Sequence, residues 1–154
     1  GVAGGRDLFD RRVSLYGYRE LFNHFADVVF PVSTLSPDAG AELTAYSWIF
    51  PNVLPMGHWW YSNIPAFIAA DLAARIQAVP KTKLLGYYSD AYKLEFILPK
   101  FNMYRRLLAE TLATEGIAKQ GWSVERALEV AKLILVDNPR RVFAPGGDRP
   151  RAGI

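Results

Sequence analysis

Hydrophobic residues gather in three short runs, each bounded by turn-forming or polar residues and each followed by a helical pattern. The runs cover residues 28–33, 53–58 and 84–89, so their starts lie 25 and 31 residues apart. Short apolar runs bounded by turn residues are typical of buried strands, and their alternation with helical patterns indicates βα units and a parallel sheet. The spacing matches a (β/α)₈ barrel, in which about 250 residues make eight units.

The helical patterns between and after these runs carry recognisable start signals. Ser36, Ser123 and the pair Ser62-Asn63 stand where helix caps are expected, and Pro37 suits a first helical position. Residues 124–136 repeat apolar residues with a regular helical period. We expect helices over about residues 12–26, 37–48, 65–78, 99–118 and 124–136, and a last short helix ending near Phe143.

The number of βα units bears on whether the fold is complete. Three units cannot close an eight-stranded barrel, and an open parallel sheet exposes unpaired strand edges. We therefore expect residues 1–143 to be the C-terminal portion of a larger (β/α)₈ barrel, an α/β fold, followed by a disordered tail at residues 144–154 that is rich in Gly, Pro and Arg. A complete small three-layer α/β domain is the alternative.

Composition excludes several classes of protein. Of the 154 residues, 51% are hydrophobic and 14% aromatic, which indicates a folded chain. Cysteine is absent, so disulfides, thiolate metal sites and a cysteine nucleophile are excluded, as fits a cytoplasmic protein. The net charge of +3 is not gathered into a dense basic face, which argues against nucleic-acid binding. No apolar run approaches the roughly 20 residues of a membrane span.

The ends of the predicted strands hold the residues most able to do chemistry. In barrels of this kind the active site lies at the C-terminal ends of the strands. Here those ends carry Ser33-Thr34, His58-Trp59-Trp60 and Ser89-Asp90. A carboxylate such as Asp90 could bind a divalent metal or act as a general base, whereas its commoner role would be to cap the next helix.

Trp59 and Trp60 are candidates for binding a sugar ring or a carbon chain. Adjacent strand residues point to opposite faces, so one ring could pack under a helix while the other lines a pocket. Plain core packing of both is the alternative. His58 suits a structural role better than a ligand role, because the chain has only one other histidine, His24, and a histidine-based metal site cannot be completed.

Other polar residues near Asp90 could contact an anionic substrate. Tyr87, Tyr88 and Tyr92 carry hydroxyls that could donate to an oxyanion, and Lys93 could pair with a carboxylate. Arg105, on the following helix, is a further candidate for anion binding. For all of these residues, packing or an exposed surface position is the alternative.

Taken in order, these residues resemble uronate isomerase (glucuronate isomerase), a family of the amidohydrolase superfamily. That family has a double-Trp run after its seventh strand, as in Gly57–Asn63 here, and a Gly-x-x-Thr-Asp-Ser-Arg segment at its eighth, where this chain has Gly86-Tyr87-Tyr88-Ser89-Asp90. An aromatic-Arg-Arg-aliphatic run then matches residues 104–108, and residues 137–143 resemble the family's C-terminal helix. The resemblance covers roughly residues 28–143.

The resemblance implies strands six to eight of a distorted (β/α)₈ barrel that converts a hexuronate aldose to its ketose, such as glucuronate to fructuronate or galacturonate to tagaturonate. Asp90 would be a metal ligand and proton-transfer group, for zinc or a similar divalent ion whose other ligands lie outside this chain. Trp59 or Trp60 would line the sugar pocket. The partner would be a small sugar acid, not nucleic acid or membrane, and a homo-oligomer is compatible with the sequence.

One departure from the family pattern concerns the substrate. Where the family has Ser-Arg after its aspartate, this chain has Ala91-Tyr92, with Lys93 next. Lysine and arginine are not equivalent at a bidentate carboxylate site. A metal-dependent hydrolase or decarboxylase of the same superfamily, and a non-catalytic α/β binding module, therefore stay open as alternatives, and these 154 residues alone are expected to be inactive.

Overall fold

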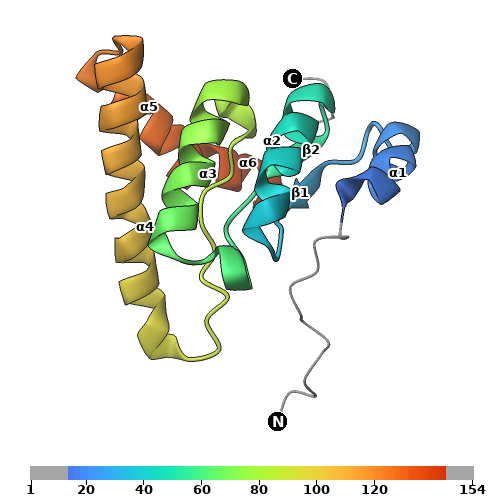
Figure 1. Ribbon diagram of the computed structural model, residues 1–154, viewed down its shortest axis with the longest axis horizontal. Coiled ribbons are helices and arrows are strands. Elements are labelled where there is room, and N and C mark those ends of the chain that lie inside the picture. The colour runs from blue at the N-terminus through green and yellow to red at the C-terminus, as the bar shows by residue number, and fades with distance from the viewer. Residues whose placement is uncertain (1–13, 145–154) are drawn as a thin grey trace.

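The structure is a computed structural model that describes residues 14–144 (Figure 1). Two features expected from the sequence fall outside the described residues: the start of the helix at residue 12 and the tail at residues 145–154. The side chain of Trp60 also lies outside the description, so its predicted place in the sugar pocket stays a prediction.

Two short parallel strands form the sheet. β1 covers Phe30–Val32 and β2 covers Val53–Pro55, and Phe30 pairs with Val53. Parallel pairing requires a crossover, which here is a short 3-10 turn and the helix α2, Gly40–Ile49. The predicted positions and direction of both strands are confirmed, but β2 is shorter than expected because the backbone turns left-handed at Gly57, with φ of +53°.

The third predicted run, residues 84–89, is not a strand. It lies beside β2, where the Leu85 N–H donates to the Pro55 carbonyl at 3.1 Å and the Gly57 N–H donates to the Gly86 carbonyl at 2.9 Å. In regular parallel pairing, the Gly57 N–H would donate to the Leu85 carbonyl instead of the Gly86 carbonyl. The ladder therefore slips by one residue at the turn of Gly57, which is why a regular strand does not form. The closed eight-stranded barrel stays a prediction.

The first helix is shorter and more irregular than the pattern predicts. A 3-10 turn, Leu15–Tyr18, precedes α1, Arg19–His24. The helix ends early because the Asn52 side chain donates to the carbonyls of Phe22 and Phe25, at 2.9 and 3.1 Å. These carbonyls thus find partners outside the helix, and the chain turns toward β1.

The helix starts test the predicted caps. The Ser36 hydroxyl accepts from the Asp38 N–H and the Ser123 hydroxyl accepts from the Arg126 N–H, so both caps are confirmed. α3 covers the predicted span, Pro65–Ala78, but its cap residue is Ile64, which gives no side-chain bond. The predicted cap at Ser62-Asn63 is wrong because Ser62 donates to the carbonyls of Thr34 and Leu35, and Asn63 accepts from the Tyr87 hydroxyl.

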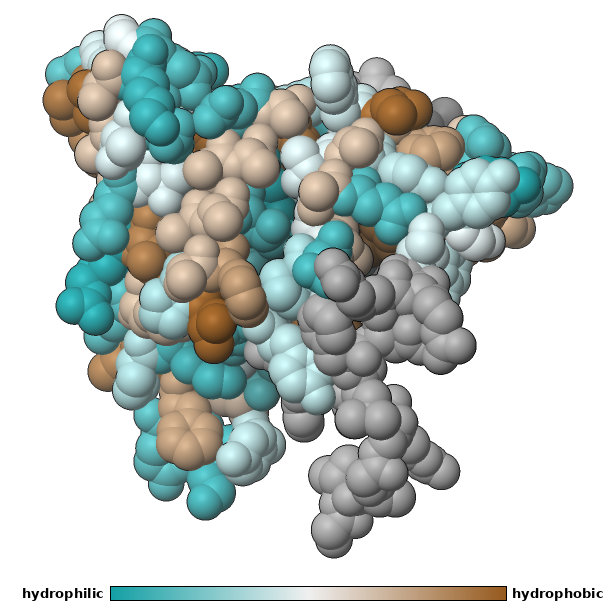
Figure 2. Space-filling model, viewed as in Figure 1, coloured by the Kyte–Doolittle hydropathy of each residue, from teal (hydrophilic) through white to brown (hydrophobic). Residues whose placement is uncertain are grey.

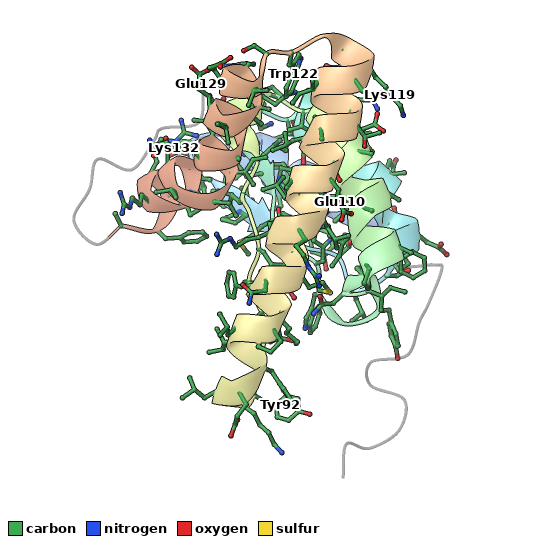
Figure 3. All side chains as sticks on the ribbon, turned by 90° about the vertical axis from the view of Figure 1, so that its left-hand side faces the viewer. Tyr92, Glu110, Lys119, Trp122, Glu129 and Lys132 are labelled. Atoms are coloured by element: carbon green, nitrogen blue, oxygen red, sulfur yellow. The ribbon has the colours of Figure 1, made fainter. Side chains whose placement is uncertain are left out.

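The C-terminal half is helical. Trp122 fills the space beside Gly116, where an added Cβ would lie 2.6 Å from its ring, and this contact closes the turn of a helical hairpin whose top is labelled in Figure 3. The three helices predicted here are confirmed, and the first two each end in a π-helical continuation. The segments are α4, Ile97–Thr111, its extension Leu112–Ala118, α5, Val124–Lys132, its extension Leu133–Asp137, and α6, Asn138–Phe143.

The main core lies where α3, α4 and α5 meet the residues 79–84 that follow α3. Its fully buried members include Ile68, Ile76, Tyr104, Val130 and Ile134. In Figure 1, α4, α3, α2 and α1 follow one another from left to right. The apolar face predicted for residues 124–136 is only partly correct: Ala127 and Ile134 are buried, whereas Val124 and Leu128 are exposed.

The outward face of α3 is also apolar. Figure 2 shows pale to dark brown surface over this helix, where Ile64 and Phe67 remain exposed. Asp71 and Arg75 are the only charged residues of α3, and Arg75 is buried. Within residues 14–144, no helix is both long and apolar enough to span a membrane.

Candidate functional site

The residues that follow β1, β2 and the third run lie close together at the C-terminal ends of the strands. The Ser33 hydroxyl, just past β1, lies 2.7 Å from the Tyr88 hydroxyl in the third run. The Trp59 indole N–H, just past β2, donates to Oδ2 of Asp90 at 2.6 Å. The predicted convergence of Ser33, Trp59 and Asp90 is thus present, and two side-chain contacts hold it together.

Asp90 has an unusual backbone conformation. Its φ is +45°, the only positive φ at a non-glycine position among the described residues. A left-handed conformation costs an L-residue about 1–2 kcal/mol, although aspartate tolerates it better than most. The residue before it is fixed, because Lys100 donates to the Ser89 carbonyl at 2.7 Å. Asp90 does not cap the following helix, and its exposed carboxylate instead faces the indole of Trp59.

A cavity of about 600 Å³ opens beside this contact. Ser33, Thr34 and Trp59 line it together with the acidic residues Asp38 and Glu42, and Leu15 and Phe30 belong to its apolar wall. Ligand pockets of this kind span about 300–1,000 Å³ and combine an apolar wall with a few polar groups. The prediction that one Trp lines a pocket therefore fits Trp59, which is half-buried.

Behind the site lies a buried charged cluster that the sequence did not predict. Arg75 donates to Oδ2 of Asp71 at 3.0 Å and to the Gly57 carbonyl at 3.2 Å, and Nδ1 of His58 lies 3.4 Å from the same Asp71 oxygen. His58 is 1% exposed, so it does not lie on the site's surface, and its structural role stays a prediction. The signal available in the sequence was an Asp and an Arg four residues apart in an otherwise uncharged helix.

Burial sets the protonation of these groups. Desolvation lowers the pKa of His58, and the Arg75 charge acts in the same direction. Burial opposes ionisation of Asp71, yet the neighbouring His58 ring and the Arg75 guanidinium together hold its pKa below the ordinary value. The cluster at neutral pH is therefore a neutral histidine beside an aspartate–arginine ion pair. Burial also raises the pKa of Tyr88, so its hydroxyl stays protonated at neutral pH.

Three residues predicted to bind the substrate do not take part in the contact between Trp59 and Asp90. Tyr92 is 84% exposed and stacks edge-on with Phe96, and Figure 3 shows it at the far tip of the α4 segment. Lys93, beside it, is exposed. Arg105 lines a small groove between α4 and α5, and within residues 14–144 no hydrogen bond or ion pair joins it to Asp90. Their roles in binding a substrate stay predictions.

Asp90 alone does not make a complete site for a metal ion. An aspartate oxygen is a suitable ligand for a divalent cation, and Asp90 presents its carboxylate at the surface. Within the described residues, however, no group of three His, Asp or Glu side chains could hold an ion. A metal at Asp90 would therefore take its remaining ligands from outside residues 14–144.

Comparison with known proteins supports the resemblance to uronate isomerases. No family model matches the chain. Two curated proteins named uronate isomerase, from Thermotoga maritima and Thermotoga sp. strain RQ2, are each 24% identical over 128 residues, which is 82% of this chain. A crystal structure of a uronate isomerase from Bacillus halodurans C-125 matches 86% of the chain with a TM-score of 0.73 and 27% identity.

These matches confirm the resemblance that the sequence motifs indicate. The chain spans 28% of the length of the curated relatives and 32% of the solved chain. It is thus similar to one part of a uronate isomerase, and its mixed α/β architecture is the architecture of that part.

Proposed function

We propose that this chain carries the strand-end site of a uronate isomerase-like enzyme and contributes Asp90 and Trp59 to it. The observation that carries the proposal is the 2.6 Å contact between Trp59 and Asp90, made across two strand ends. It lies within a chain that resembles uronate isomerases in both sequence and fold.

The proposed reaction is the interconversion of an aldose and a ketose hexuronate. A carboxylate base removes the proton from C2, and the aldehyde oxygen at C1 gains a proton to form an enediol. The proton is then returned to C1 while the C2 hydroxyl loses its own, so no atoms are gained or lost. Asp90 suits the base role because its carboxylate is exposed at the site and is oriented by the N–H of the Trp59 indole.

The other groups of the site support this assignment. The apolar face of the Trp59 ring offers a surface for the carbon skeleton of the sugar. The Tyr88 hydroxyl, protonated and bonded to Ser33, lies on the same side of the sheet and could donate to a substrate oxygen. A divalent ion bound through Asp90 would supply polarisation of the carbonyl, with its other ligands outside the described residues.

The test uses the full open reading frame that contains these residues, incubated with glucuronate or galacturonate, with ketose formation measured. The first prediction is that Asp90→Asn lowers kcat by at least about 100-fold, the size of a general-base contribution. Glu95→Gln is the matched control, because this exposed acid lies five residues away on the 3-10 turn before α4.

Turnover by the wild type and by Glu95→Gln, lost in Asp90→Asn, would support the proposal. A protein inert on both sugars, or an Asp90→Asn variant as active as the control, would contradict it. Cleavage of an ester or amide, or loss of carbon dioxide from the substrate, would replace it with the hydrolase or decarboxylase alternative.

A further inference from the structure

The buried pair on α3 has a specific target, which is the turn that carries Trp59. Arg75 is 3% exposed, and its guanidinium holds two partners at once, the Asp71 carboxylate and the Gly57 carbonyl. Asp71 in turn faces Nδ1 of His58. The two residues immediately before Trp59, namely Gly57 and His58, are thus both contacted from the same helix.

The turn is also confined from its other side. The ring of Tyr88 occupies the space next to Gly57, where an added Cβ would lie 2.2 Å from the ring, and Tyr88 is itself bonded to Ser33. Asp71 is equally confined, because Gly40 of α2 packs against it and a Cβ there would lie 2.3 Å from its carboxylate. The backbone before Trp59 therefore lies between two fixed surfaces, which restricts the direction of the indole.

Stability alone does not account for this cluster. Burying an ion pair costs desolvation that its attraction often only repays, so apolar residues of similar volume would hold the helix as well. α3 already packs through Ile68, Leu72 and Ile76, all buried in the main core. What apolar residues could not supply is a directed bond to the Gly57 carbonyl.

We propose that Asp71 and Arg75 are positioning residues that fix the turn at Gly57 and His58, so that the Trp59 indole points at the Asp90 carboxylate. The catalytic consequence rests on the proposed function, whereas the structural consequence does not. Arg75 acts through the backbone carbonyl of Gly57, and Asp71 acts through the His58 ring and through its ion pair with Arg75.

The experiment compares Asp71→Asn and Arg75→Lys in the full reading frame. Asp71→Asn keeps the shape of the side chain, and Arg75→Lys keeps the charge but loses the fork that reaches both partners. The matched control is Gln77→Ala, since Gln77 is on the same helix and bonds Glu115 at 2.9 Å, away from the turn. Two variants are used so that misfolding of one leaves the test intact.

Two properties are measured. The Trp59 indole N–H resonance, identified by its loss in Trp59→Phe, reports the bond to Asp90 without need of turnover. We expect it to move in Asp71→Asn and Arg75→Lys toward its position in Asp90→Asn, and to stay in place in Gln77→Ala. We also expect kcat to fall by up to about 100-fold with little change in KM, since misplacing a reacting group costs this much.

The outcomes separate the two proposals. A wild type without turnover, together with a resonance that moves in both variants, would support the positioning role and overturn the proposed function alone. An indole resonance unchanged in the folded variants, or moved as far by Gln77→Ala, would overturn the positioning role even in an active isomerase. Lower stability with an unchanged resonance would show that the cluster only holds the fold together.

Discussion

Gly57 gives the sharpest prediction about the geometry of the site. Substitution by alanine meets two obstacles at this position. The residue has a φ of +53°, and a left-handed conformation costs alanine about 1–2 kcal/mol. The new Cβ would also lie 2.2 Å from the Tyr88 ring, which is far inside contact distance.

The ring of Tyr88 cannot move without loss. Its hydroxyl bonds Ser33, and the forced shift is of the kind that costs about 1–3 kcal/mol in a packed region. The two terms together predict that Gly57→Ala lowers the free energy of unfolding by about 2–5 kcal/mol.

Gly121 provides the matched control. Its φ is +70°, but no heavy atom would lie within 4 Å of a Cβ added there. Gly121→Ala should therefore show the conformational cost alone, about 1–2 kcal/mol. The assay is urea unfolding followed by circular dichroism. Equal losses in the two variants would refute the close approach of Tyr88 to the turn.

Three further predictions follow from single contacts. Burial lowers the pKa of His58 below 6.5, so as the pH falls the unfolded chain takes up this proton before the folded chain does, and stability should fall below about pH 6.5. The urea midpoints at pH 7.5 and 5.5 should therefore differ less in His58→Gln than in the wild type. An equal difference in both proteins would contradict burial of a neutral ring. Burial lowers the pKa of Lys83 from 10.5 to about 8, so as the pH rises the folded chain loses this proton before the unfolded chain does. Stability should therefore rise between about pH 8 and 9.5 in the wild type but not in Lys83→Met. The same rise in Lys83→Met would show that Lys83 is not the titrating group. Tyr88→Phe should lower the free energy of unfolding, measured by thermal unfolding, by about 0.5–1.5 kcal/mol. Adding Ser33→Ala should lower it little further, because the hydrogen bond between the two hydroxyls is already lost. Additive losses would show that the two hydroxyls do not pair.

Features set by local chemistry were predictable from the sequence. Ser36 and Ser123 cap their helices because each needs only N–H groups two or three residues away. The meeting of Ser33, Trp59 and Asp90 was predictable for a different reason, which is that parallel strands end on the same side of a sheet. That rule places residues from distant parts of the chain without any knowledge of their contacts.

Features set by distant partners were not predictable. Asn52 ends α1 through carbonyls 30 and 27 residues earlier in the chain, so helical spacing alone overestimates that helix. Arg75 reaches a carbonyl 18 residues away, and its periodicity on α3 gives no indication of that target. The third run failed as a strand because its register depends on the left-handed turn at Gly57, which lies outside the run itself.

The central claim is that Asp90 transfers a proton between C2 and C1 of a hexuronate, and isomerisation in deuterium oxide tests it most directly. The full reading frame would be incubated with glucuronate or galacturonate, and the ketose analysed by proton NMR. Transfer through a carboxylate predicts deuterium at C1 of the product in the wild type and no product in Asp90→Asn. A ketose that carries at C1 the hydrogen removed from C2 of the substrate, with no deuterium, and that Asp90→Asn forms at an undiminished rate, would contradict the claim.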